Sequence, residues 1–137
     1  MPIEYRVDHD HRRVVVEGHG TLSTDELFRY QREVWSRSDV AGYDELADMS
    51  DVQSIAQPTP GMMRELAGLS ASTDPAGGRS RFAIIAPQQE IFGLGRMYEA
   101  YRGLVNRSTK QVAVFRDRAE ALRWLGGDAP PEGEPRS

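Results

Sequence analysis

Cysteine is absent from this sequence of 137 residues. Its absence excludes disulfide bonds, thiolate metal sites and a cysteine nucleophile, and it is typical of proteins from a reducing compartment. Long apolar runs are also missing: the longest cover about five residues, whereas a membrane-spanning helix needs about 20. The chain does not begin with the charged-then-apolar pattern of a signal peptide. We therefore expect a cytoplasmic domain without a membrane span.

The sequence has no stripe of basic residues. It contains 17 basic and 21 acidic residues, which gives a net charge of −4. This balance argues against nucleic acid as a partner. The length fits one domain with its own core, which we place at residues 1–126. Residues 127–137 are rich in proline and show no periodicity, so we expect a disordered tail there.

Short apolar segments predict five strands. Residues 3–8 alternate between apolar and polar side chains, and residues 12–17 contain three consecutive valines. A polar turn at residues 8–11 separates these two segments and predicts a hairpin with the first strand at an edge. Three further strands are predicted at residues 43–48, 81–86 and 111–115, and residues 49–52 are expected to form a loop.

Helix signals follow the second to fifth strands. Ser23 and Glu26 have the spacing of a capping box, and Asp117 and Glu120 repeat it before the last helix. Thr59 before Pro60 predicts a helix start, because proline is favoured at the first helical position. Apolar residues at helical spacing predict a long helix over residues 89–106.

The order of these elements predicts an α/β fold: a five-stranded, mostly parallel mixed sheet with an N-terminal hairpin and about four helices. If neighbouring strands follow the order of the chain, right-handed crossovers place most helices on one face. Residues 14–16 and 82–86 are apolar on both faces, so a helix, the chain ends or another subunit must cover the second face.

The pattern resembles the SpoIIAA-like or STAS superfamily, and more narrowly the bacterial STAS/SEC14-type domains of unknown function. The resemblance covers about residues 3–125 and rests on six segments in order: Val16-Glu17-Gly18-His19-Gly20 with Leu22-Ser23, Leu46-Ala47-Asp48-Met49-Ser50-Asp51-Val52, Arg81-Phe82-Ala83-Ile84-Ile85-Ala86, Phe92-Gly93-Leu94-Gly95-Arg96-Met97-Tyr98-Glu99, Val114-Phe115-Arg116-Asp117, and Glu120-Ala121-Leu122-Arg123-Trp124-Leu125. It implies a fold of stacked βα turns and implies little about activity.

The better-known anti-sigma-factor antagonists of this superfamily carry a phosphorylatable serine in a loop before the second helix. The corresponding loop here reads Gln57-Pro58-Thr59-Pro60-Gly61 and lacks that serine. Thr59 is better explained as a helix cap than as a modified residue. The likeness therefore does not extend to a phosphorylation switch.

Several candidate chemical sites have a simpler structural interpretation. Phe92-Gly93-Leu94-Gly95-Arg96 lacks the third glycine of a dinucleotide loop and the lysine of a P-loop, so we expect its glycines to allow close helix packing. The histidines of the turn at residues 8–11 are expected to be solvated rather than to bind metal. His19 is expected to be a surface or turn residue, since the sequence places no nucleophile or carboxylate beside it.

An acidic group at Asp44, Glu45, Asp48 and Asp51 surrounds the third predicted strand. Asp48 and Asp51 are expected at the carboxyl end of that strand, where open α/β sheets bind ligands. They could attract a cation or a basic partner, although turn chemistry is the better explanation. No metal ion or cofactor is predicted.

Soft and aromatic side chains gather on the second and third predicted helices. Methionine adapts to irregular shapes and suits binding surfaces, although core packing explains most such residues. We take as a candidate surface for a ligand or a partner the following residues: Met62, Met63, Leu66, Phe92, Arg96, Met97, Tyr98 and Tyr101.

No catalytic set is assembled by the sequence, so we expect a protein that is not an enzyme. The first hypothesis is a regulatory module that acts through protein–protein contact with an unknown partner and forms a homodimer. The alternative is a carrier or sensor of a small lipophilic ligand, held between the second and third helices.

Overall fold

The computed structural model describes residues 2–75, 77–105 and 108–127. Strands and helices alternate after an initial hairpin, in this order: β1 (Ile3–Asp8), β2 (Arg13–Leu22), α1 (Thr24–Trp35), a short 3-10 helix (Ser38–Val40), β3 (Asp44–Ile55), α2 (Pro60–Ser72), β4 (Arg81–Ile85), α3 (Gln89–Gly103), β5 (Gln111–Phe115) and α4 (Arg118–Leu125). The predicted tail at residues 127–137 lies outside the described residues except for its first position, and so does the predicted end of the long helix at Asn106.

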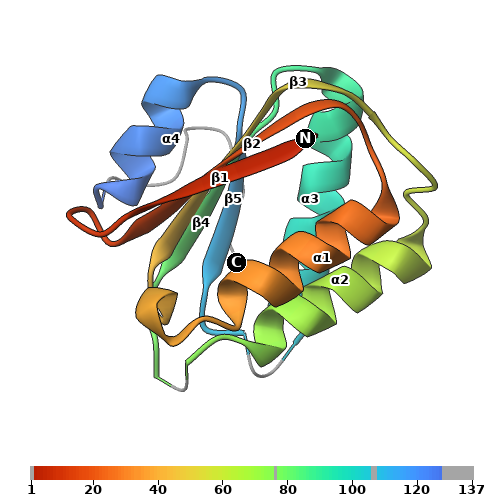
Figure 1. The fold of residues 1–137 in the computed structure, drawn as a ribbon. Coiled ribbons are helices and arrows are strands. Elements are labelled where there is room, and N and C mark those ends of the chain that lie inside the picture. The colour runs from red at the N-terminus through yellow and green to blue at the C-terminus, as the bar shows by residue number, and fades with distance from the viewer. Residues whose placement is uncertain (1, 76, 106–107, 128–137) are drawn as a thin grey trace.

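The five strands form one sheet in chain order, β1-β2-β3-β4-β5. β1 pairs antiparallel with β2, and the remaining neighbours pair in parallel. Helices α1, α2 and α3 cover one face of the sheet, while α4 lies against the other face (Figure 1). The predicted fold class, the edge position of the first strand and the placement of most helices on one face are confirmed.

Two strands are longer than the sequence predicts. β2 continues through Gly18, His19 and Gly20 to Leu22, and β3 continues through the expected loop at residues 49–52 to Ile55. The two extensions pair with each other beyond register shifts that follow Glu17 and Gly20. A bulge inserts an extra residue into one strand and so interrupts the alternation of apolar and polar side chains. The extensions therefore lack the period of two by which a strand is predicted. Asp48 and Asp51 consequently lie within β3 rather than at its carboxyl end.

The predicted helix caps form. Ser23 and Glu26 make a complete capping box at α1, in which each side chain bonds the other residue's backbone N–H. Thr59 Oγ1 accepts from the Met62 N–H with Pro60 at the first position of α2, and Asp117 accepts from the Glu120 N–H at α4. Each cap satisfies backbone donors that the first helical turn leaves unpaired.

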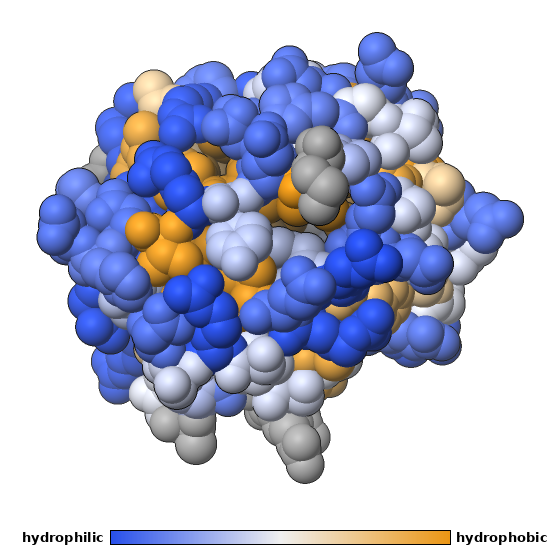
Figure 2. Space-filling view, viewed as in Figure 1, coloured by the Kyte–Doolittle hydropathy of each residue, from blue (hydrophilic) through white to orange (hydrophobic). Residues whose placement is uncertain are grey.

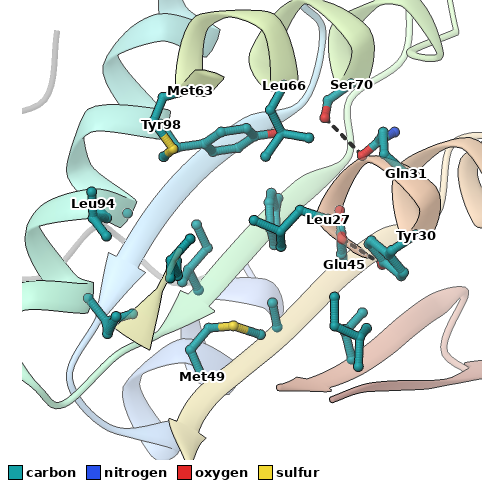
Figure 3. A pocket seen from close by; sticks show the side chains of 18 residues that line it. Leu27, Tyr30, Gln31, Glu45, Met49, Met63, Leu66, Ser70, Leu94 and Tyr98 are labelled. Atoms are coloured by element: carbon teal, nitrogen blue, oxygen red, sulfur yellow. Dashed lines mark hydrogen bonds between the residues drawn. The ribbon is translucent and has the colours of Figure 1, made fainter. Parts of the chain in front are cut away.

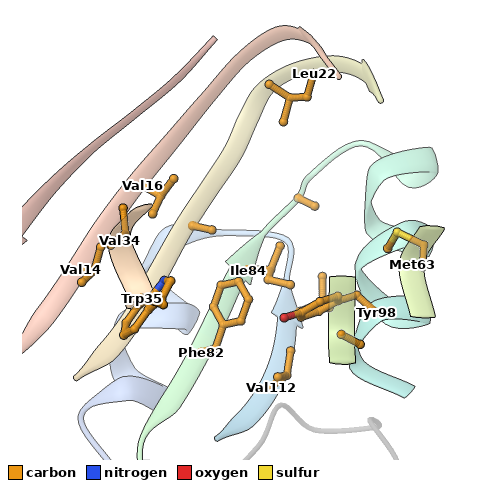
Figure 4. Close-up of a cluster of buried hydrophobic side chains, with 14 of the residues drawn as sticks. Val14, Val16, Leu22, Val34, Trp35, Met63, Phe82, Ile84, Tyr98 and Val112 are labelled. Carbon is orange, nitrogen blue, oxygen red and sulfur yellow. The ribbon is translucent and has the colours of Figure 1, made fainter. Parts of the chain in front are cut away.

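The larger core lies between the sheet and helices α1 to α3. Val14 and Val16 of β2 lie beside Val34 and Trp35 of α1, and Phe82 and Ile84 of β4 lie toward Tyr98 of α3 (Figure 4). A smaller core on the opposite face joins β2 to β5 with α4 and contains Val15, Leu46, Ala83, Ile85, Ala113, Phe115, Ala121, Trp124 and Leu125. A helix is therefore the element that covers the apolar residues of the second face.

Candidate functional site

A cavity lies between the sheet and the three helices α1, α2 and α3. Its volume is about 120 Å³. Half-buried apolar side chains from β1, α1, β3, α2 and α3 line it together with buried ones from the sheet, α2 and α3. The apolar lining residues are Ile3, Val16, Leu27, Ala47, Met49, Ile55, Met63, Leu66, Phe82, Ile84, Ile91 and Leu94. The walls therefore favour an apolar occupant.

One side of the cavity is polar. Figure 3 shows Ser70, Gln31, Glu45 and Tyr30 together on that side, across from Met63, Leu94 and Met49. The polar groups come from α1, β3 and α2, and Tyr98 of α3 also lines the cavity. A few convergent polar groups in an apolar pocket are typical of a site that orients a small molecule.

A chain of hydrogen bonds holds the Glu45 carboxylate. Trp35 Nε1 donates to the Tyr30 hydroxyl at 3.1 Å, and that hydroxyl donates to Glu45 Oε2 at 2.7 Å. Tyr30 is half-buried as a whole, but its hydroxyl is enclosed between these two partners. Burial, reinforced by the Glu45 charge, raises the pKa of Tyr30 well above its usual value. The hydroxyl thus keeps its proton and fixes one carboxylate oxygen of Glu45.

Lys110 supplies the charge opposite Glu45. Its Nζ lies 3.8 Å from Glu45 Oε1 and 3.5 Å from the centre of the Trp35 ring. Burial raises the pKa of Glu45 and lowers that of Lys110, while the attraction between them opposes both changes. A buried pair of this kind is costly to desolvate, so it is weak evidence for a stabilising role and leaves a functional role to be tested.

Hydroxyl and amide groups continue the polar side toward α2. Ser70 Oγ donates to Gln31 Oε1 at 2.8 Å, and Gln31 Nε2 donates to Thr73 Oγ1 at 3.3 Å. Burial raises the pKa of the Tyr98 hydroxyl to about 12, so this group is protonated at neutral pH. The polar side of the cavity therefore offers both donors and acceptors.

Three of the eight residues predicted as a binding surface line the cavity: Met63, Leu66 and Tyr98. The other five lie elsewhere on α2 and α3 and are Met62, Phe92, Arg96, Met97 and Tyr101. Phe92 stacks under the Arg116 guanidinium at 4.0 Å, and Arg96 forms an ion pair with Glu99 at 3.5 Å. The cavity is thus bounded by the sheet and three helices rather than by the second and third helices alone.

Sequence reasoning missed the polar side of the cavity, most clearly Glu45, Tyr30 and Gln31. In the sequence Glu45 stands among aspartates and is not distinguished from them by charge. A signal was present in the strand alternation: Glu45 and Ala47 share one face of β3, and both line the cavity. Lys110 was a second signal, because a lysine directly before an apolar strand is placed close to the core and needs a charged partner there.

The acidic group around β3 is separated in the structure. Asp44 accepts from the Arg81 N–H at 2.8 Å, Asp48 bonds Arg118 at 3.0 Å, and Asp51 lies 3.4 Å from His19 Nδ1. Glu45 alone lines the cavity. Among the described residues, no group of histidines and carboxylates has the arrangement of a metal site.

His19 meets carboxylates outside the cavity. Its Nε2 lies 3.2 Å from Glu4 and its Nδ1 lies near Asp51, at a bulge where Gly18 approaches the Val52 and Met49 side chains. The His19 side chain is 37% exposed and that of Asp51 is 74% exposed, so the pair faces solvent. The sequence placed no carboxylate beside His19, and that expectation was wrong, but the prediction of a surface position is confirmed.

The remaining candidates follow the simpler interpretation. His9 and His11 are exposed in the hairpin turn, where His9 contacts the Tyr43 hydroxyl and His11 contacts Asp8. Gly95 packs closely on β5, since a Cβ there would lie 3.1 Å from Val114 Cγ2. Gly93 has open space around it. No helix within the described ranges has the length and apolar character needed to cross a membrane.

No protein-family model and no curated protein matches the sequence. Solved structures do match it, and two of them resemble it along most of its length. An uncharacterised protein of the DUF3478 family from Shewanella loihica PV-4, described as having a SpoIIAA-like fold, shares 15% identity with a TM-score of 0.57 over 90% of this chain and 93% of its own. The anti-sigma factor antagonist SpoIIAA in its unphosphorylated form shares 11% identity with a TM-score of 0.50 over 92% of this chain and 99% of its own.

Identities this low carry information about architecture alone. The five-stranded mixed sheet, its antiparallel first pair and the four helices agree with that architecture. The chain therefore has the SpoIIAA-like fold that its sequence resembles.

Proposed function

We propose that this protein binds a small apolar molecule in the cavity between the sheet and helices α1 to α3. The observation that carries the proposal is the cavity of about 120 Å³ with apolar walls and one polar side. An engineered cavity of about 150 Å³ with entirely apolar walls binds benzene, which sets the scale for the occupant. A single ring fits this scale, whereas a long lipid chain requires the helices to move.

The side chains that line the cavity support binding rather than catalysis. Ser70 is the hydroxyl best placed to act as a nucleophile, but it donates to the amide oxygen of Gln31, which is not a base. His19, the histidine that meets Asp51, does not line the cavity. A sensor or a carrier needs only the pocket that the described residues form.

Filling the cavity tests the proposal. Ala47 of β3 lines the cavity, so Ala47→Leu places a larger side chain in the space that a ligand would occupy. We expect wild-type protein to bind toluene, observed as shifts of amide NMR signals from the lining residues, and Ala47→Leu to lose this binding. The matched control is Ala100→Leu, which makes the same change at an exposed position on α3.

Thermal unfolding of all three proteins establishes that each is folded. If toluene shifts no lining residue of the wild-type protein, or if Ala47→Leu binds as well as Ala100→Leu, the cavity is not a binding site.

A second candidate is a cytoplasmic interaction module. It is favoured by the likeness to a protein named as an anti-sigma factor antagonist, which acts on another protein. The sequence led us to expect a homodimer in addition. Figure 2 shows that the viewed face is mainly hydrophilic, with apolar residues reaching the surface in small separate areas. This surface supports a polar rather than a broad apolar contact, and the molecular mass in solution tests the dimer.

A further inference from the structure

One acceptor on the polar side of the cavity has no hydrogen bond. Glu45 Oε2 accepts from Tyr30, but Glu45 Oε1 has only the Lys110 Nζ at 3.8 Å, which exceeds hydrogen-bond distance. The Trp35 N–H also lies beside this carboxylate, but it donates to the Tyr30 hydroxyl. Glu45 is 5% exposed and lines the cavity. Oε1 is not among the fully enclosed polar atoms that lack a partner, so the cavity leaves this carboxylate oxygen accessible. Because hydrogen bonds to an ionised acceptor are stronger than those to a neutral one, a donor on a ligand is favoured there.

Two acidic and two basic side chains already balance the charge beside the cavity. Glu45 faces Lys110, and Asp74 forms an ion pair with Arg102 at 2.9 Å in which both side chains are buried. An anionic ligand would place like charge against Glu45, and a cationic ligand would leave one positive charge unbalanced in a desolvated region. A neutral ligand avoids both costs.

A donor is also available to a ligand oxygen. Gln31 Nε2 has two N–H groups and gives one to Thr73. Gln31 and Glu45 lie on the same side of the cavity, as Figure 3 shows. A hydroxyl group both donates and accepts, so it matches an acceptor and a donor at once, whereas a methyl group matches neither.

We propose that the cavity selects a neutral single-ring molecule whose hydroxyl group donates to Glu45 Oε1. This inference rests on the proposed binding function and specifies the class of ligand. The ring occupies the space among Leu27, Met49 and Leu94, and the hydroxyl lies on the side of Glu45 and Gln31. The carboxylate recognises the ligand in this scheme and transfers no proton.

A series of one-ring probes tests the inference on the wild-type protein. Toluene and phenol have the same shape and differ by a methyl or a hydroxyl group, while benzoate and benzylammonium add a negative or a positive charge. We expect phenol to bind about 10-fold more tightly than toluene, because hydrogen bonds to charged groups outweigh the loss of one apolar group. Benzoate and benzylammonium should bind more weakly than phenol.

A double variant shows that the preference comes from the carboxylate. Glu45→Leu with Lys110→Met replaces both buried charges with apolar groups of similar size, a change that proteins often tolerate. In this variant the Tyr30 hydroxyl still accepts from Trp35 but no longer has Glu45 as the acceptor of its proton. The expected result is that the 10-fold preference for phenol over toluene is lost.

The outcomes separate the two proposals. Toluene binding as tightly as phenol to the wild-type protein, or either charged probe binding more tightly than phenol, overturns the hydroxyl inference and leaves apolar binding intact. Failure of every probe, toluene included, overturns both. The wild-type series decides the question even if the double variant does not fold.

Discussion

Burial of a single hydroxyl should make the stability of this protein sensitive to alkali. Tyr98 is 6% exposed, and burial raises its pKa from 10.0 to about 12. The folded protein disfavours tyrosinate, so the contribution of the Tyr98 hydroxyl is present below pH 10 and is lost as the pH rises toward 12. We expect wild-type stability to fall relative to Tyr98→Phe by about 2 kcal/mol over this range, because the slope approaches about 1.4 kcal/mol per pH unit only midway between the two pKa values.

Urea unfolding of both proteins at several alkaline pH values measures this difference directly. The phenylalanine variant keeps the edge-to-face contact with the Phe82 ring, whose centre lies 5.9 Å away, so the comparison isolates the hydroxyl. A difference that stays constant between pH 10 and 12 would contradict the prediction.

Individual charges were the hardest feature to predict from the sequence. Asp44, Glu45, Asp48 and Asp51 are chemically similar and close together, yet each has a different partner in the fold. Strand alternation separates Glu45 from its neighbours, but only the positions of Tyr30 and Lys110 turn it into part of a site. These contacts join residues that are far apart in the sequence, so a local sequence pattern does not reveal them.

Two glycines on α3 test how closely that helix packs on the sheet. A Cβ on Gly95 would lie 3.1 and 3.2 Å from the two γ-carbons of Val114, whereas nothing lies within 4 Å of a Cβ on Gly93. Val114 is buried and β-branched, so it has little freedom to move away. We expect Gly93→Ala to stabilise the protein by about 0.5–1 kcal/mol through helix propensity.

Gly95→Ala carries the same gain in propensity and should nevertheless destabilise the protein. Thermal or urea unfolding of the two variants checks this opposition of signs. Equal stabilisation by both substitutions would show that α3 does not need a glycine against β5.

Elements marked by a short sequence motif were predicted well. Strand segments whose extent depends on pairing with another strand were not. The caps at Ser23 and Asp117 were predicted from pairs of residues three apart, and the cap at Thr59 from the proline that follows it. The extensions of β2 and β3 were missed because they pair across bulges and contain glycine and polar residues. The cavity lies beside these extensions and uses Met49 and Ile55 from β3, so missing the strand also hid part of the site.

At the scale of the whole molecule, the sequential order of the strands explains which helices cover each face of the sheet. Crossover helices α1, α2 and α3 share one face, and α4, which follows the last strand, is free to cover the other (Figure 1). Order and fold class were predictable because they follow from the sequence of apolar segments. The choice among a helix, the chain ends and a second subunit for the other face required the structure.

The surface of the whole molecule bears on the expected homodimer. Large apolar side chains are exposed at three described positions, Tyr5, Leu104 and Leu122, which belong to β1, the end of α3 and α4. A stable dimer buries about 800 Å² on each partner around an apolar centre. Scattered residues supply no such centre, so we predict that light scattering at tens of micromolar will give the mass of one chain, 15.3 kDa. A mass of two chains would instead support the homodimer of the interaction hypothesis and would direct attention to the polar surface or to residues outside the described ranges.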